Sequence, residues 1–129
     1  MRGYVLDASA LLALLKQEDG SEQVAEFITE GAVINSVNLS EVIAKLSEAG
    51  MPEDAIHETL DMLTLMTVDF DMALAYEAGL LRPLTKQAGL SLGDRACLAL
   101  AKQLNLPAIT TDRVWENLSL DITIQVIRV

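Results

Sequence analysis

The strongest constraint on the fold is an alternation of short apolar runs with longer helical stretches. Apolar runs at residues 3–6, 32–34 and 108–110 have the length and composition typical of buried strands. Because helical stretches separate these runs, we predict parallel strands joined by crossover helices. Residues 122–129 alternate well enough to form a final strand. The sequence therefore predicts an α/β fold with three layers and a short, mainly parallel sheet.

Helical stretches fill most of the chain between the predicted strands. Asp19-Gly20 and Gly50 are predicted breaks, Pro52 is expected to open a helix, and Pro83 is expected to limit one. The predicted helices cover residues 8–16, 21–28, 39–49, a stretch from 52 onward, 71–81 and 92–104. Residues 66–68 fit either a strand or a connection. Since no repeat or linker is visible, we predict one domain over residues 1–129.

Composition and charge restrict the classes of function. One cysteine, Cys97, excludes an internal disulfide framework, and one histidine, His57, excludes a His-rich metal site. The 9 basic and 19 acidic residues give a net charge of −10, a field that repels phosphate backbones and anionic membranes. This field favours divalent cations or a basic protein partner. No targeting or membrane-spanning stretch is visible, so we expect a cytoplasmic protein.

Three acidic residues lie just after predicted strands. Asp7 follows the first strand directly, Asp112 lies close behind the strand at 108–110, and Glu41 lies in the segment after the second strand. The carboxyl ends of parallel strands meet at one edge of a sheet, where α/β proteins place their working crevice. We therefore expect these carboxylates to lie close together.

A fourth acidic residue, Asp94, shares a helix face with Cys97, Leu98 and Ala101. This spacing predicts that Asp94 points to the core side of its helix. A carboxylate there is costly unless it is paired, protonated or bound to a cation. A helix cap is the alternative interpretation of Asp94.

The other acidic residues also have ordinary structural interpretations. Asp7 fits a helix N-cap and Asp112 fits a turn. Glu41 fits a capping box with Asn38 or an exposed ion pair with Lys45. Taken together, the carboxylates indicate a metal site, because a close pair repels by about 4 kcal/mol at an effective dielectric near 20. Mg²⁺ or Mn²⁺ would relieve this repulsion and activate water against a phosphodiester.

Four segments distributed along the whole chain carry motifs whose combination is specific. They read VLDASAL at 5–11, NLSEV at 38–42, LGDRACLALA at 92–101 and ITTDRVW at 109–115. In this order they resemble the PIN-domain family, and specifically the VapC-type ribonuclease toxins of VapBC toxin–antitoxin pairs. The resemblance implies an α/β/α fold, Mg²⁺- or Mn²⁺-dependent endoribonuclease activity on RNA, a homodimer and a VapB-like antitoxin.

The resemblance also implies roles for individual residues. Carried over by position, the catalytic and metal-holding residues are Asp7, Glu41, Asp94 and Asp112, with Ser9 and Thr110 as polar supports. Two other interpretations stay open. One is a phosphoryl-transfer domain that uses Asp7, although Ser9 stands where one such class has a second Asp. The other is a non-catalytic acidic module that binds proteins.

Two groups of apolar residues have both a core and a partner-binding interpretation. The helix at residues 8–16 is apolar almost all round, which is typical of a fully buried helix or of an interface. Four methionines cluster in the middle of the sequence, and methionine-rich surfaces adapt to partner helices. These methionines are Met51, Met62, Met66 and Met72.

Overall fold

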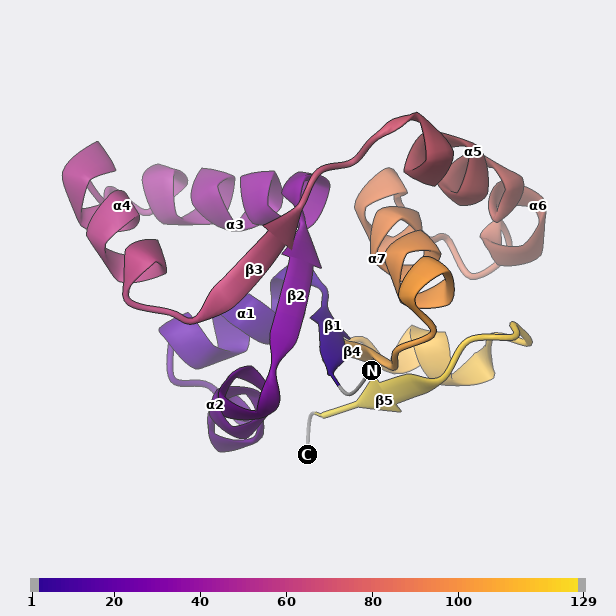
Figure 1. Cartoon of the computed structure of the whole chain (residues 1–129). Helices are drawn as coiled ribbons and strands as arrows, with labels where there is room; N and C mark the ends of the chain where they lie inside the picture. Colours follow the sequence, from indigo (N-terminus) through magenta and orange to yellow (C-terminus); the bar gives the residue numbers. More distant parts are fainter. Residues whose placement is uncertain (1–2, 128–129) are drawn as a thin grey trace.

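Five short parallel strands form the central sheet of the computed structural model, which describes residues 3–127 (Figure 1). Their order across the sheet is β3-β2-β1-β4-β5, and every neighbouring pair is parallel. The strands are β1 (Tyr4–Leu6), β2 (Ala32–Asn35), β3 (Leu65–Val68), β4 (Ala108–Thr110) and β5 (Ile124–Val126). This arrangement confirms the predicted α/β fold with a short parallel sheet.

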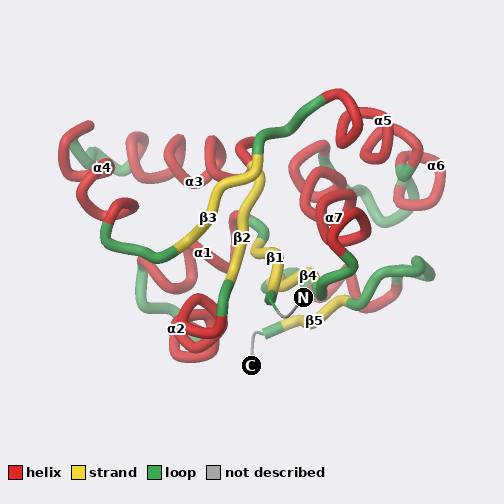
Figure 2. Tube along the Cα trace, viewed as in Figure 1, coloured by secondary structure: helices red, strands yellow, loops and turns green. Residues whose placement is uncertain are grey.

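Helices connect the strands and cover both faces of the sheet (Figures 1 and 2). The α-helices are α1 (Ala8–Leu15), α2 (Ser21–Glu30), α3 (Ser36–Glu48), α4 (Glu53–Asp61), α5 (Met72–Leu80), α6 (Arg82–Thr85) and α7 (Leu92–Leu104). A 3₁₀ helix, η1 (Arg113–Asn117), follows β4. None of the helices between residues 3 and 127 combines the length and the apolar character needed to cross a bilayer.

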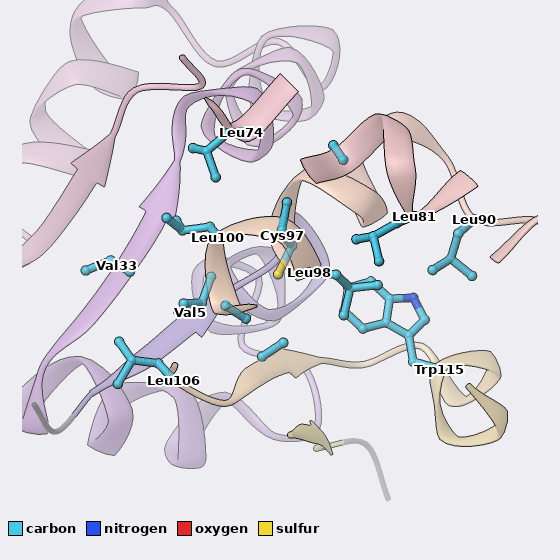
Figure 3. Packing of buried hydrophobic residues seen from close by; sticks show 14 residues of the cluster. Val5, Val33, Leu74, Leu81, Leu90, Cys97, Leu98, Leu100, Leu106 and Trp115 are labelled. Carbon is cyan, nitrogen blue, oxygen red and sulfur yellow. The ribbon is translucent and has the colours of Figure 1, made fainter. Parts of the chain in front are cut away.

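Alternate residues of the strands feed two separate cores. Val5 and Val33 pack in the core under α5 and α7, which Figure 3 shows around Cys97 and Trp115. The next residues along the same strands belong to the core under α1, α2, α3 and α4. Since successive side chains of a strand point to opposite faces, the runs read as continuously apolar because both faces are covered. Cys97 is fully buried, as expected for a small core residue.

Several details of the fold differ from the sequence-based expectation or resolve a choice that it left open. Helix α3 begins three residues earlier than expected, because the side chain of Asn35 caps it. Helix α5 ends at Leu80, before Pro83 as expected, but a short helix, α6, follows it directly, with Pro83 in its first turn, where a missing N–H costs little. The ambiguous segment at 66–68 is part of strand β3, and η1 was not predicted. The last strand is shorter than expected, and residues 128–129 of that prediction lie outside the described residues.

The two apolar groups singled out in the sequence have different environments. In α1, Leu11 is buried, and Leu12, Leu14 and Leu15 are partly buried against the same core. Among the methionines, only Met51 packs against a core. The core interpretation is wrong for three of them, because Met62, Met66 and Met72 have exposed fractions of 83%, 61% and 76%.

In this sheet order, the chain changes its direction of progress across the sheet between β1 and β4. From β1 the chain moves outward to β2 and β3, and it then crosses to the other side of β1 to form β4 and β5. In open α/β sheets, such a change of direction leaves a crevice outside the carboxyl ends of the strands. Asp7 follows β1 at this point, and Thr110 is the last residue of β4.

Candidate active site

One pocket at this edge is lined by all four acidic residues that the sequence singled out. It has a volume of about 220 Å³. Its lining consists of Asp7, Ala8, Ser9, Leu12, Asn38, Glu41, Lys45, Asp94 and Asp112. Residues from four distant parts of the sequence therefore meet in one small cavity.

Asp7 is the buried member of this set, with only 4% of its surface exposed. It caps α1, because its Oδ1 accepts a hydrogen bond of 2.8 Å from the backbone N–H of Ala10. The same oxygen accepts a bond of 2.7 Å from the hydroxyl of Ser9, and Oδ2 accepts one of 2.6 Å from the hydroxyl of Thr110. Both carboxylate oxygens are thus fixed by neighbouring donors.

Burial raises the pKa of Asp7 from 3.8 to about 6. Removal of the carboxylate from water is the largest cause, and the nearby charge of Asp94 raises the pKa further. The hydrogen bonds from Thr110, Ser9 and Ala10 lower it, but they do not compensate for the burial. A cation beside Asp7 would supply the missing stabilisation of the charged form.

Ser9 and Thr110 connect the start of α1 to the end of β4. Besides its bond to Asp7, the Ser9 hydroxyl accepts from the N–H of Thr111 at 3.0 Å. The Thr110 hydroxyl accepts from the N–H of Asp112 at 3.1 Å. The structure therefore places both predicted supports in direct contact with Asp7, and their role in catalysis stays a prediction.

Glu41 lies on the opposite side of the pocket and is exposed. Its Oε1 accepts a hydrogen bond of 2.9 Å from the side-chain amide of Asn38. Asn38 does not cap α3, so the capping-box interpretation is wrong; the cap is Asn35. An ion pair with Lys45 is also absent among the described residues, although Lys45 lines the same pocket.

Asp94 and Asp112 both take part in helix capping, Asp94 at the start of α7 and Asp112 at the start of η1. Asp94 forms a capping box with Ser91, in which its Oδ2 accepts from the Ser91 N–H at 2.9 Å. Oδ1 of Asp112 accepts from the N–H of Val114 at 3.0 Å and caps η1. Asp94 is half-buried rather than on the core side, because as the third residue of α7 it folds back over the helix end.

The buried thiol of Cys97 lies below three of the carboxylates. Burial raises its pKa well above the ordinary value, and the charges of Asp7, Asp94 and Glu41 raise it further. One buried group is thus within electrostatic range of three acidic side chains from different elements. Because the neutral thiol form is favoured, Cys97 serves as a buried packing residue next to the pocket and not as a nucleophile.

The donor chemistry of the pocket fits a hard divalent cation. All four acidic side chains offer oxygen ligands, which Mg²⁺ and Mn²⁺ prefer. In their present rotamers, no three acidic, histidine or cysteine side chains between residues 3 and 127 are grouped closely enough to hold one ion together. Mg²⁺ commonly needs only one or two carboxylates and keeps several waters, so a partly hydrated ion is the species that this lining fits.

Sequence reasoning missed three residues that shape the site. Asn35 and Asn38 are almost completely buried and form a side-chain hydrogen bond of 2.7 Å. Gly93 lies against the carboxylate of Glu41. The available signals were two asparagines between a predicted strand and Glu41, and the position of Asn38 and Gly93 inside two of the motif segments.

Comparison with known proteins adds a family and a set of similar folds. The sequence profile of the PIN domain matches residues 4–119. A search of curated protein sequences finds no match. DNA-bound VapBC from Salmonella typhimurium is similar in structure, with a TM-score of 0.76 and 20% identity over 97% of this chain and 98% of that chain.

Two further solved structures have the same fold. VapBC2 from Rickettsia felis, bound to a DNA fragment from its promoter, gives a TM-score of 0.73 and 20% identity, covering 95% of this chain and 96% of that one. VapBC-5 from Mycobacterium tuberculosis gives a TM-score of 0.66 and 23% identity over the full length of both chains. At these identities the matches show the fold.

Proposed function

Since the chain belongs to the PIN-domain family, a family of nucleases, we propose that it is a Mg²⁺- or Mn²⁺-dependent endoribonuclease. We further propose that it acts in the cytoplasm as the toxin of a type II toxin–antitoxin pair of the VapBC kind. The observation that carries the proposal is the single pocket lined by Asp7, Glu41, Asp94 and Asp112 at the carboxyl edge of the sheet.

The proposed mechanism assigns different tasks to the carboxylates. When bound, Mg²⁺ or Mn²⁺ supplies a Lewis acid that lowers the pKa of water and offsets charge on the scissile phosphate. Asp7 and Asp94 would be the principal ligands, and Glu41 and Asp112 would hold waters of the ion's shell. No side-chain nucleophile is needed, which agrees with a buried, neutral Cys97.

Ser9 and Thr110 would keep Asp7 in place during this reaction. Their hydroxyls contact different oxygens of Asp7, at 2.7 and 2.6 Å, so rotation of the carboxylate would break at least one bond. Both hydroxyls are in turn fixed by backbone N–H groups that follow β4. Lys45 provides a positive charge in the pocket lining, and we assign it to a substrate phosphate.

The proposed partners follow from the similar structures. The matched Salmonella and Rickettsia structures are VapBC complexes bound to DNA, which supports a VapB-like antitoxin as the partner of this chain. A homodimer, implied by the family resemblance, would use exposed apolar surface, and this chain has several such side chains. The most exposed of them are Met62, Met72, Tyr76, Leu80 and Leu84.

The strong negative charge restricts the kind of RNA substrate. With a net charge of −10, the protein repels the phosphate backbone of RNA at long range, whatever the RNA sequence. Divalent cations in the pocket and Lys45 would offset this repulsion only locally. We therefore propose a narrow specificity for one structured RNA rather than unspecific degradation.

The test is RNA cleavage by the purified protein, free of any partner. A mixed RNA pool is incubated with Mg²⁺ or Mn²⁺, in parallel with EDTA and with the Asp94→Asn variant. Asparagine at 94 retains an oxygen that can cap α7, so the variant is expected to fold. We expect discrete fragments that require both the metal and Asp94. Cleavage that persists in Asp94→Asn would refute the site, whereas intact RNA together with weak, non-stoichiometric Mn²⁺ binding would favour a non-catalytic binding module.

A further inference from the structure

We propose that Asn38 and Gly93 are positioning residues that fix the carboxylate of Glu41 against the start of α7. Asn38 supplies the hydrogen bond, and Gly93 leaves the space. The inference deepens the proposed function, and its activity measurements rest on that function. Its structural part can be tested in the protein without metal.

The side-chain amide of Asn38 connects two elements that are far apart in the sequence. Its Nδ2 donates to Oε1 of Glu41 on α3 and to the carbonyl of Gly93 on α7, both at 2.9 Å. Asn38 is only 1% exposed, so its donating amide is shielded from water. Both hydrogens of the amide are used, and one of them holds a carboxylate that lines the pocket.

A second buried amide sets the orientation of the first. Asn35 donates from Nδ2 to Oδ1 of Asn38 at 2.7 Å, and its own Oδ1 accepts from the backbone N–H groups of Val37 and Asn38. If the Asn38 amide were turned over, its oxygen would face two acceptor oxygens and its nitrogen would face a donor. The network therefore allows one orientation, in which the N–H groups point toward Glu41 and Gly93.

The absence of a side chain at Gly93 is the other half of the arrangement. A Cβ added there would lie 2.5 Å from Oε1 of Glu41 and 2.6 Å from its Cδ. Gly93 lies within helix α7, so alanine at this position meets no backbone obstacle. Gly93→Ala would therefore push the carboxylate away while leaving the helix intact.

The arrangement explains how an exposed carboxylate on a flexible side chain stays in a defined place. Among the described residues, Glu41 has no ion pair, and the hydrogen bond that holds its carboxylate is the one donated by the side-chain amide of Asn38. Without the amide, or with a methyl group in place of the Gly93 hydrogen, the carboxylate would leave this defined place in the pocket lining. Removing such supporting partners from a metal site typically costs 10- to 100-fold in activity or metal affinity.

The experiment is a pair of double-mutant cycles. Asn38→Ala and Gly93→Ala are each made in the wild-type protein and in Glu41→Ala, and kcat/KM for RNA and the Kd for Mn²⁺ are measured. Each single change is expected to lower kcat/KM by about 10- to 100-fold in the wild type. In Glu41→Ala each is expected to change it by less than about twofold, because the carboxylate that they position is gone. Equal losses in both backgrounds would overturn the proposal.

A shorter side chain provides a rescue, and another glycine provides the control. In Glu41→Asp the carboxylate is withdrawn by one methylene, so Gly93→Ala should cost less there than in the wild type. Gly79, inside α5, has no atom within 4 Å of an added Cβ. Gly79→Ala should therefore leave kcat/KM unchanged. If it lowers kcat/KM as much as Gly93→Ala does, the steric argument is wrong.

Nuclear magnetic resonance of the metal-free protein separates failure of this inference from failure of the proposed function. Glu41→Ala and Gly93→Ala should each shift the side-chain amide signals of Asn38 and speed their hydrogen exchange, whereas Gly79→Ala should do neither. Signals of Asn38 that stay unchanged in both variants would overturn the inference even if the protein cleaves RNA. Shifted signals in a protein without nuclease activity would support the positioning and refute the function.

Discussion

The two sides of the pocket hold their carboxylates in opposite ways. On the β1–β4 side, the charged group itself is buried, because Asp7 is 4% exposed and is surrounded by the hydroxyls of Ser9 and Thr110. On the α3–α7 side, the buried groups are the neutral amides of Asn35 and Asn38, and the carboxylate of Glu41 stays exposed.

This difference determines where electrostatic cost accumulates. A buried carboxylate loses hydration that hydrogen bonds replace only in part, which is why the pKa of Asp7 is raised. Buried amides carry no charge, and their hydrogen bonds are satisfied, so the α3–α7 side stores no such cost. It follows that a bound cation would interact electrostatically mainly with Asp7, whereas the α3–α7 side determines the shape of the pocket.

The largest effect should come from removing the charge on the β1–β4 side. We expect Asp7→Asn to lower RNA cleavage by at least about a hundredfold, a scale typical of losing a main electrostatic group of an active site. Asp112→Asn is the comparison, because Asp112 is exposed and should cost less. The measurement is kcat/KM at saturating Mn²⁺. Equal losses in the two variants would remove the distinction between buried and exposed carboxylates.

The same substitution should stabilise the metal-free protein at neutral pH. The folded state binds a proton at Asp7 with a pKa of about 6, against 3.8 ordinarily, so it holds more protons than the unfolded state between these values. The stabilising contribution of protonated Asp7 is therefore complete below about pH 4 and is lost as the pH rises through 6. Relative to Asp7→Asn, the wild type should lose about 2 kcal/mol of unfolding free energy between pH 4 and pH 8.

Urea unfolding of both proteins over this pH range measures the effect. The difference between them isolates Asp7, because the remaining carboxylates titrate in both. Added Mg²⁺ should reduce the difference in unfolding free energy between the two proteins at pH 8, since a cation stabilises the charged form of Asp7 in the folded state only. If this difference in unfolding free energy does not depend on pH, Asp7 is ordinarily solvated, and the electrostatic contrast between the two sides of the pocket is wrong.

Much of the β1–β4 side could be predicted from the sequence, because its signals are local. Asp7 directly follows an apolar run, and the strand ends bring it and Asp112 to one edge. The sequence left open whether Asp7, Asp94 and Asp112 are helix caps or site residues. The structure shows that these are not alternatives, since Asp7 and Asp112 cap helices, Asp94 completes the capping box of Ser91, and all three line the pocket. Asp7 and Asp112 lie in the crevice because α1 and η1 start at the carboxyl ends of β1 and β4.

The α3–α7 side escaped prediction because its contacts join distant residues. The bond from Asn38 to the Gly93 carbonyl spans 55 positions, and no periodic pattern encodes it. Gly93 acts through the side chain that it lacks, which leaves no chemical trace in the sequence. The capping box expected for Asn38 failed for a related reason: Asn35, one turn earlier, takes the cap and frees the Asn38 amide for Glu41.

On the α3–α7 side, the corresponding stability effect should come from Asn35. Asn35→Ala removes the cap of α3 and leaves the buried Oδ1 of Asn38 without a donor. Loss of a cap costs about 1 kcal/mol and an unsatisfied buried acceptor about as much again, so we expect a loss of about 2 kcal/mol. The control is Asp71→Ala, which removes the cap of α5 and disturbs no buried side-chain network. Unlike the effect at Asp7, the loss at Asn35 should be the same at pH 5 and pH 8, and a strong pH dependence would contradict it.

The smallest effect should separate the capping function of Asp94 from its position in the pocket. Ser91→Ala removes the hydroxyl that accepts from the Asp94 N–H at 3.2 Å, but it retains the Ser91 N–H that donates to the Asp94 carboxylate. We expect the unfolding free energy to fall by about 1 kcal/mol, the ordinary cost of an N-cap, with kcat/KM changed by less than about threefold. Asp94→Asn should show the reverse, with stability retained and cleavage lost. If Ser91→Ala lost cleavage as well, the cap of α7 would itself set the position of Asp94, and the α3–α7 side would control the chemistry as tightly as the hydroxyls around Asp7 do.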